Sequence, residues 1–211
     1  MNYTNFKDIP ASELSSGIPN SHLGCQLSSF QNKYKDSAFF MSLLALTNLL
    51  LDMNLETSPR YVLLCGSPGC GKTHYMVGLF RSMVAKLGYC QGDGPLFIPF
   101  SVLASEMIGM FKEKVPLRVG LGEYEEARWL FIDDFTSSER VLKEGSLEYI
   151  TFRDLLIDRY DKNYTLITSC NFHSSEVLTE LDRLFGGYVT SRLSQSKIIQ
   201  FPDVDLRKVQ K

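Results

Sequence analysis

The 211-residue sequence lacks the features that mark membrane, secreted or metal-binding proteins. Its longest apolar run, residues 38–51, is too short to span a bilayer and is interrupted by polar residues. The first ten residues, MNYTNFKDIP, lack the basic segment and apolar core of a signal peptide. His22, His74 and His173 have no metal-ligand spacing and no nucleophile–base arrangement, which favours surface or packing roles. We therefore expect a cytosolic (cytoplasmic) protein that makes no contact with a membrane.

The composition also lacks an excess of charge of either sign and a disulfide framework. A net charge of −2 excludes a broadly basic nucleic-acid coat, so any contact with DNA would need a local patch. The five cysteines are odd in number and form no C-x-x-C pair, which indicates reduced, buried thiols. There is no internal repeat and no low-complexity tract. The length and the 44% hydrophobic fraction fit one soluble domain with a short appendage.

The sequence predicts an N-terminal arm followed by one α/β domain. Residues 1–36 are polar and contain scattered prolines and glycines, which indicates an extended arm and a candidate partner-binding segment. Residues 37–211 alternate strands with helices, which predicts a mainly parallel sheet covered on both faces. A helix after residue 100 is expected to be capped by Ser101, and residues 115–127 are expected to form a connection. The expected strands are 61–65, 96–100, 129–134, 164–169 and 197–201. The expected helices are 37–52, 101–114 and 147–160, a further helix that begins at the phosphate-binding loop and ends at residue 87, and two short pieces separated by residues 186–187.

Residues 61–73, YVLLCGSPGCGKT, predict a strand, a phosphate-binding loop and the start of a helix. The pattern G-x-x-x-x-G-K-[ST] allows positive φ angles at its glycines, so that backbone N–H groups can point at phosphate oxygens. Lys72 is expected to reach the β- and γ-phosphates of ATP, and the Thr73 hydroxyl to ligate Mg²⁺. The predicted nucleotide-binding residues are Gly66, Ser67, Pro68, Gly69, Cys70, Gly71, Lys72, Thr73 and His74.

Residues 129–134, WLFIDD, predict a buried parallel strand whose carboxyl end carries two aspartates. Downstream of a phosphate-binding loop, this pattern predicts that Asp133 holds Mg²⁺, directly or through water. Asp134 stands where a carboxylate can orient or deprotonate an attacking water, with a turn or helix-cap role as the alternative. Asn171 follows the strand predicted at 164–169, where its amide could contact the γ-phosphate or its water.

Together with Ser169-Cys170-Asn171 and the segment 188–193, YVTSRL, these motifs resemble the AAA+ ATPases. Within that group the chain looks most like the DnaC-type helicase loaders and the IstB-type transposition ATPases. Residues 17–19 (GIP), 28–30 (SSF) and 205–207 (DLR), and paired aspartates at the end of WLFIDD, favour this branch. The resemblance covers about residues 17–207.

The resemblance implies the α/β fold of the P-loop NTPases: a three-layer AAA+ sandwich with a five-stranded sheet. The phosphate-loop strand would be central, and the C-terminal helical lid reduced or absent. ATP and Mg²⁺ would bind between neighbouring subunits of an oligomer. Asn171 would be sensor one, and Arg192 the arginine finger that completes the neighbour's site. Arg183 is the competing finger, and a surface salt bridge is the alternative role for Arg192.

The resemblance also implies that the region before WLFIDD faces single-stranded DNA in the assembly. The candidate DNA-binding residues there are Lys112, Lys114 and Arg118, although a solvated helix end fits them equally well. The leading hypothesis is an ATP-hydrolysing helicase loader acting in DNA replication initiation, with a replicative DNA helicase as its partner. One alternative is a transposition helper that delivers a transposase to target DNA. Another is a nucleotide-gated adaptor that binds ATP with little turnover.

Overall fold

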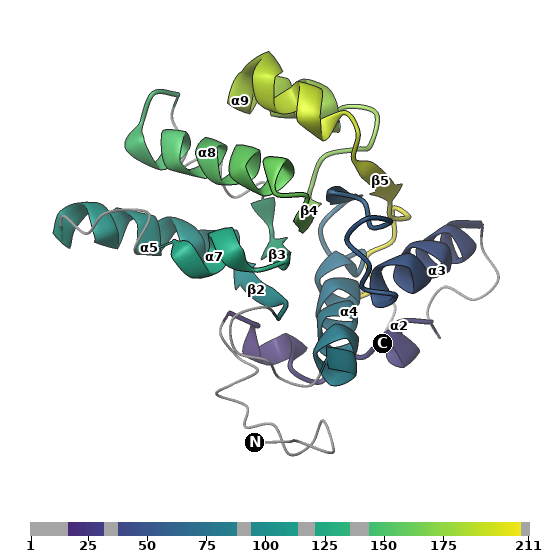
Figure 1. The fold of residues 1–211 in the computed structure, drawn as a ribbon. Helices are drawn as coiled ribbons and strands as arrows, with labels where there is room; N and C mark the ends of the chain where they lie inside the picture. Colours follow the sequence, from purple (N-terminus) through teal and green to yellow (C-terminus); the bar gives the residue numbers. More distant parts are fainter. Residues whose placement is uncertain (1–16, 32–37, 88–93, 114–120, 136–143, 208–211) are drawn as a thin grey trace.

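The computed structural model describes residues 17–31, 38–87, 94–113, 121–135 and 144–207. Within them, five strands form one sheet in the order β2-β3-β4-β1-β5, and every neighbouring pair is parallel (Figure 1). The predicted mainly parallel five-stranded sheet is confirmed, and both ends of every strand lie within one residue of the predicted ends. The strands are β1 (Tyr61–Cys65), β2 (Leu96–Pro99), β3 (Trp129–Asp133), β4 (Thr165–Cys170) and β5 (Lys197–Gln200).

The position of the phosphate-loop strand differs by one place from the expectation. β1 is an interior strand that pairs with β4 and β5, whereas the middle strand of the five is β4. β1, β3 and β4 are buried along their whole length, as expected for strands covered on both faces. The ends of these three interior strands therefore meet at one edge of the sheet, where the residues that follow them can converge.

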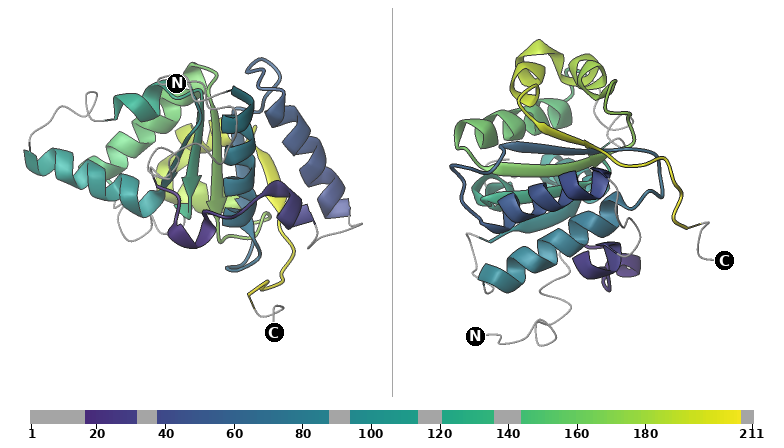
Figure 2. Two further views of the ribbon diagram at one scale, coloured as in Figure 1. Left: turned by 90° about the horizontal axis from the view of Figure 1, so that it is seen from below. Right: turned by 90° about the vertical axis from the view of Figure 1, so that its right-hand side faces the viewer.

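Helices cover both faces of the sheet, which gives the three-layer arrangement seen in Figures 1 and 2. Two separate hydrophobic clusters fill the spaces between the layers. One cluster joins the sheet to the helices that precede and follow β1, and the other joins it to the later helices. The first layer holds α2 (Leu27–Gln31), α3 (Ala38–Leu51) and α4 (Lys72–Leu87); the second holds α5 (Phe100–Glu113), α7 (Gly122–Glu126), α8 (Leu147–Asp161) and α9 (Val177–Leu193).

Two local predictions are wrong. Helix α5 begins at Phe100, so Ser101 lies inside its first turn and is not its cap. The reason is packing: Phe100 is fully buried, with its ring against those of Phe135 and Phe152. The segment 115–127, predicted as a connection, contains the short helix α7. Its Tyr124 side chain is buried, and α7 packs against α8 of the same layer. The predicted break in the last helix is confirmed, since Gly186 has φ 72° inside α9.

Part of the predicted N-terminal arm packs on the domain. Residues 17–31 hold the 3₁₀ turn η2 (Asn20–His22) and α2, and Ile18 and Phe30 are buried in the same cluster as α4. Helix α2 approaches α4 so closely that a Cβ on Gly78 would lie 2.8 Å from the backbone nitrogen of Leu27. A partner-binding role for residues 1–36 stays a prediction. No helix in the described ranges is both long and apolar enough to cross a bilayer.

Candidate nucleotide-binding site

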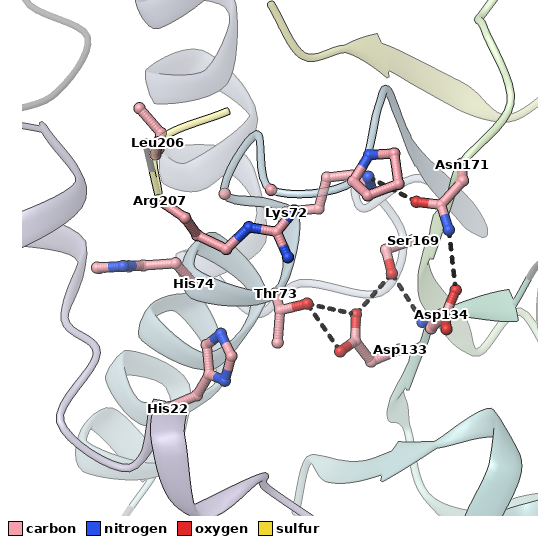
Figure 3. A pocket seen from close by; sticks show the side chains of 13 residues that line it. His22, Lys72, Thr73, His74, Asp133, Asp134, Ser169, Asn171, Leu206 and Arg207 are labelled. Atoms are coloured by element: carbon pink, nitrogen blue, oxygen red, sulfur yellow. Dashed lines mark hydrogen bonds between the residues drawn. The ribbon is translucent and has the colours of Figure 1, made fainter. Parts of the chain in front are cut away.

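A cavity of about 400 Å³ opens where β1, β3 and β4 end and α4 begins (Figure 3). Its size falls within the range of small-ligand sites. Most of the predicted site residues line it, while Gly66, Ser67 and Cys70 are not among its lining residues. The lining residues are His22, Pro68, Gly69, Gly71, Lys72, Thr73, His74, Asp133, Asp134, Ser169, Asn171, Leu206 and Arg207.

The loop between β1 and α4 has positive φ angles at its glycines, as the sequence predicted. Gly66, Gly69 and Gly71 have φ angles of 144°, 86° and 96°. A Cβ at position 69 would also displace the Asp205 carboxylate and the Arg207 guanidinium, which pack against this glycine. The loop leads into the first turn of α4, where the backbone N–H groups and the helix dipole favour an anion.

Lys72 is held inside this loop. Its side chain is 7% exposed, and its ammonium donates to the carbonyl oxygens of Gly66 (2.6 Å) and Ser67 (2.9 Å). A third bond runs to Asn171 Oδ1 at 3.0 Å. The three protons of the ammonium therefore have three oxygen acceptors, and one of these acceptors is a side chain that can rotate.

Thr73 and Asp133 meet across the cavity floor. Thr73 Oγ1 lies 2.8 and 3.1 Å from the two carboxylate oxygens of Asp133, which is 6% exposed. Ser169 Oγ donates to Asp133 Oδ1 at 2.6 Å and accepts from the backbone N–H of Asp134 at 2.8 Å. Sequence reasoning used Ser169 only as part of the motif 169–171 and assigned no role to its hydroxyl, which lies near the end of a strand beside β3.

Asn171 connects the two halves of the site. Its Oδ1 accepts from Lys72, and its Nδ2 donates to Asp134 Oδ1 at 3.2 Å. Asp134 is exposed and has φ 54°, a left-handed conformation that aspartate tolerates. An unbroken line of hydrogen bonds thus runs Thr73, Asp133, Ser169, Asp134, Asn171, Lys72, as Figure 3 shows.

The C-terminal segment 203–207 forms a wall of the cavity that sequence reasoning missed. Ser67 Oγ donates to Asp203 Oδ1 at 2.5 Å, and the Leu206 N–H donates to the Gly69 carbonyl at 3.0 Å. Arg207 also lines the cavity, and its guanidinium pairs with Asp205 at 2.9 Å. These contacts depend on the chain returning to the loop after β5, and no periodic pattern encodes that return.

The two histidines at the cavity differ in their settings. His74 Nε2 lies 2.8 Å from Ser29 Oγ and 3.2 Å from the Gln26 carbonyl, so the residue links α4 to the start of α2. His22 comes from the turn η2 and lines the cavity as well, although the sequence assigned it only a surface or packing role. The segment 17–31 therefore contributes to the site as well as to the core.

Cysteines at the loop fit the expected reduced state. Cys25, Cys65, Cys70 and Cys170 are free thiols, while Cys90 lies outside the described residues. Burial raises the pKa of the Cys70 thiol, with Lys72 acting in the opposite direction. Cys70 therefore stays a neutral thiol at pH 7, and its side chain packs beneath the loop instead of lining the cavity.

The predicted arginine finger does not line the cavity of its own chain. The Arg192 guanidinium lies 3.9 Å from the centre of the Tyr188 ring and donates to the Tyr188 hydroxyl at 2.8 Å. It also approaches the Tyr160 ring at 5.5 Å and Asp161 at 3.9 Å. The competing candidate, Arg183, forms an ion pair with Glu180 on the same helix at 2.9 Å.

The predicted DNA-binding residues are only partly covered by the structure. Lys112 is exposed near the end of α5. Lys114 and Arg118 lie outside the described residues. A DNA-binding role for these three residues stays a prediction.

A scan against models of known protein families finds no match to this chain, and a search of curated proteins finds none either. Solved structures do match. The DnaC helicase loader is 18% identical, with a TM-score of 0.68 over 87% of this chain and 100% of that one. DnaI is 15% identical, with a TM-score of 0.63 over 89% and 93%. DnaA bound to AMPPCP and single-stranded DNA is 17% identical, with a TM-score of 0.65 over 87% of this chain and 50% of that one.

These matches confirm the predicted fold. The chain has the AAA+ fold, with a five-stranded parallel sheet between helical layers, and it resembles the DnaC-type loaders at the level of the fold. It spans all or nearly all of the DnaC and DnaI structures but only half of the DnaA structure. Identities of 15 to 18% carry the fold and leave the activity to be argued from the site.

Proposed function

We propose that this chain is an ATP-dependent helicase loader that acts in DNA replication initiation. It would assemble on or remodel a replicative DNA helicase and contact single-stranded DNA. The observation that carries the proposal is the line of hydrogen bonds from Thr73 to Lys72 through both aspartates and Asn171, inside a fold that matches the whole solved DnaC loader.

Nucleotide binding is the first step of this function. A phosphate oxygen approaching the loop must replace one acceptor of the Lys72 ammonium. Asn171 Oδ1 is the replaceable one, because the Gly66 and Ser67 carbonyls belong to the loop backbone. Since the same amide donates to Asp134, its movement would change the hydrogen bonding of that carboxylate. Asn171 would thereby link phosphate binding to the group that acts on water.

The residues present also fit Mg²⁺. The Thr73 hydroxyl and the Asp133 carboxylate lie within 3.1 Å of each other beside the loop. No cluster of three or more His, Cys, Asp or Glu suited to a metal occurs in the described ranges. Mg²⁺ does not need one, since it is commonly held by one or two carboxylates, waters and phosphate oxygens. When bound, it would neutralise phosphate charge.

Asp134→Asn is expected to slow ATP hydrolysis about a hundredfold while leaving ATP affinity within about twofold, because the amide cannot act as a base on water. Single-turnover hydrolysis and nucleotide-binding titrations measure the two effects separately. Asp182→Asn, at an exposed aspartate on α9, serves as the matched control and should leave both unchanged. Equal rates for Asp134→Asn and the unaltered protein would assign Asp134 to the alternative turn role.

Arg192 is proposed to act on the ATP of a neighbouring subunit. Arg192→Ala should reduce turnover about a hundredfold, the effect of losing one donor to the developing charge. Mixing Arg192→Ala with Lys72→Ala protein should restore part of the turnover, because some mixed interfaces pair an intact loop with an intact arginine. Arg183→Ala, on the same helix, is the control. If the Arg183 variant loses turnover and is the one rescued by mixing, Arg183 is the finger.

The partner is tested by loading itself. The chain is combined with the replicative helicase of its own host and a circular single-stranded DNA, and helicase retained on the DNA is measured with and without ATP. ATP-dependent retention that Lys72→Ala abolishes supports the proposal. Delivery of a transposase instead supports the transposition alternative. Assembly on ATP binding with almost no hydrolysis supports the adaptor.

A further inference from the structure

The segment 203–207, which follows β5, crosses the phosphate-binding loop as a strap and is anchored there at two points. Ser67 Oγ donates to Asp203 Oδ1 at 2.5 Å, and the Leu206 N–H donates to the Gly69 carbonyl at 3.0 Å. The Leu206 side chain also packs against the hydrophobic cluster that contains residues of β1 and α4. The strap therefore holds its last residue at a defined place beside the loop.

That last residue, Arg207, lies against the loop and reaches into the nucleotide cavity. A Cβ on Gly69 would lie 2.6 Å from Arg207 Nη2 and 2.8 Å from Arg207 Nε, so the guanidinium packs directly on this glycine. Figure 3 shows the side chain extending from the strap into the cavity that it lines. Among the described lining residues, Lys72 and Arg207 are the two permanent cations. The cavity thus offers an anion a second positive charge.

Asp205 orients the Arg207 guanidinium and leaves part of it open. Asp205 Oδ1 accepts from Arg207 Nε at 2.9 Å and from the Arg207 backbone N–H at 3.1 Å, and Asp205 Oδ2 accepts from Nη2 at 3.4 Å. Nη1 carries two further N–H donors, and they have no acceptor within the part of the chain that the structure describes. The guanidinium can therefore bind a phosphate oxygen through Nη1 while it keeps its bonds to Asp205.

The place of Arg207 on the loop indicates which phosphates it meets. In loops of this type the backbone N–H groups cradle the α- and β-phosphates, whereas the lysine reaches the β- and γ-phosphates. Arg207 lies over the loop backbone at Gly69. The Lys72 ammonium is bonded elsewhere, to the Gly66 carbonyl and to Asn171. Arg207 therefore faces the phosphates that ATP and ADP have in common.

We propose that Arg207 binds the α- and β-phosphates of the nucleotide and holds ATP and ADP with equal strength. The inference rests on the nucleotide-binding function proposed above and adds to it a residue that sets affinity without distinguishing the two nucleotides. A contact to these phosphates is the same before and during loss of the γ-phosphate. Such uniform binding contributes to KM and leaves the rate of the chemical step unchanged.

Arg207→Gln should weaken binding of ATP and ADP equally, by about tenfold, which corresponds to the loss of one charged contact to phosphate. The glutamine amide keeps an N–H donor for Asp205, so the strap should stay in place. Isothermal titration with ADP and with a non-hydrolysable ATP analogue measures the two affinities. The KM for ATP should rise about tenfold, while the single-turnover rate at saturating ATP should change by less than about twofold.

Arg153→Gln is the matched control, because Arg153 also pairs with an aspartate, Asp154, at 2.9 Å but lies on α8, outside the cavity. It should leave both affinities unchanged. Inorganic pyrophosphate, titrated against a fluorescent ADP analogue, is the probe for phosphate contact alone, and Arg207→Gln should weaken its binding about tenfold as well. The urea midpoint of Arg207→Gln should equal that of the unaltered protein.

Four results would overturn the proposal. Weaker binding of the ATP analogue alone would assign Arg207 to the γ-phosphate. Weaker nucleotide binding with unchanged pyrophosphate binding would place it against the base or the ribose. A lower urea midpoint would mean that Arg207 acts only by holding the strap, and unchanged affinity for every ligand would remove it from the site.

The variant Lys72→Ala separates failure of this inference from failure of the proposed function. If Lys72→Ala loses ATP binding and Arg207→Gln does not, only the role of Arg207 is wrong. If Lys72→Ala binds ATP normally, the nucleotide site itself is wrong.

Discussion

Replacing Lys72 by alanine is expected to lower ATP affinity about a hundredfold and turnover about a hundredfold, a combined loss of about ten-thousandfold in kcat/KM. Of the described residues, Lys72 is the cation that the loop itself encloses, and the burial of its ammonium makes the charge act strongly on a phosphate. Loss of the side chain also removes the donor that Asn171 Oδ1 shares with the loop carbonyls. Isothermal titration with a non-hydrolysable ATP analogue and a phosphate-release assay measure the two effects.

Lys86→Ala provides the control, because Lys86 is exposed in the last turn of the same helix, far from the cavity. It should change neither affinity nor rate. Unaltered ATP binding by Lys72→Ala would remove the basis for the nucleotide site. Weakened ATP binding with normal assembly on the helicase would instead keep the site and reassign the role of ATP.

The sequence was sufficient for those parts of the site that one continuous segment encodes. The loop from Gly66 to Thr73 has its own backbone requirements, and the apolar runs of β1 and β3 fix where that loop and Asp133 emerge. Because parallel strands end at one edge, Asn171 after β4 could also be expected there. The structure brings all of them together around one cavity.

The missed parts depend on contacts between segments distant in the chain. Ser169 acts through Asp133 and Asp134 on the neighbouring strand, and its hydroxyl alone carries no pattern. Leu206 and Arg207 reach the cavity only because the chain folds back over Gly69 after β5. The helix α7 was missed because five residues with three glutamates have no apolar periodicity, and its place is set by Tyr124.

Arg159→Leu is expected to destabilise the protein by about 4 kcal/mol, which places a marginal domain near unfolding. Arg159, on α8, is fully buried, and its partners are backbone carbonyls: those of Tyr124 (2.6 Å), Ala127 (2.7 Å) and Thr165 (2.8 Å). A leucine keeps most of the packing but removes the hydrogen bonds that Arg159 donates to these three oxygens. Urea unfolding followed by the fluorescence of the single tryptophan, Trp129, measures the loss.

The cost of burying this charge does not reverse the expectation. Burial lowers the pKa of Arg159 to about 10, which is below its pKa in the unfolded chain. The free-energy cost of burying the charge therefore persists at every pH below about 10 and diminishes only as the pH rises through that value. At neutral pH the guanidinium is charged, and its fork matches carbonyls from α7, from the C-terminal cap of α7 at Ala127, and from β4. Removing the arginine removes the cost together with the three hydrogen bonds that join these segments.

Arg153→Ala separates this role from a general effect of charge on α8. Arg153 forms an exposed ion pair with Asp154 at 2.9 Å, and exposed pairs contribute little, so its loss should change stability by less than about 0.5 kcal/mol. Arg159→Lys should fail to rescue, because one ammonium on a shorter reach cannot serve three carbonyls from separate segments. If Arg159→Leu proves as stable as Arg153→Ala, water or main-chain donors satisfy those carbonyls and Arg159 is not what holds α7 to β4.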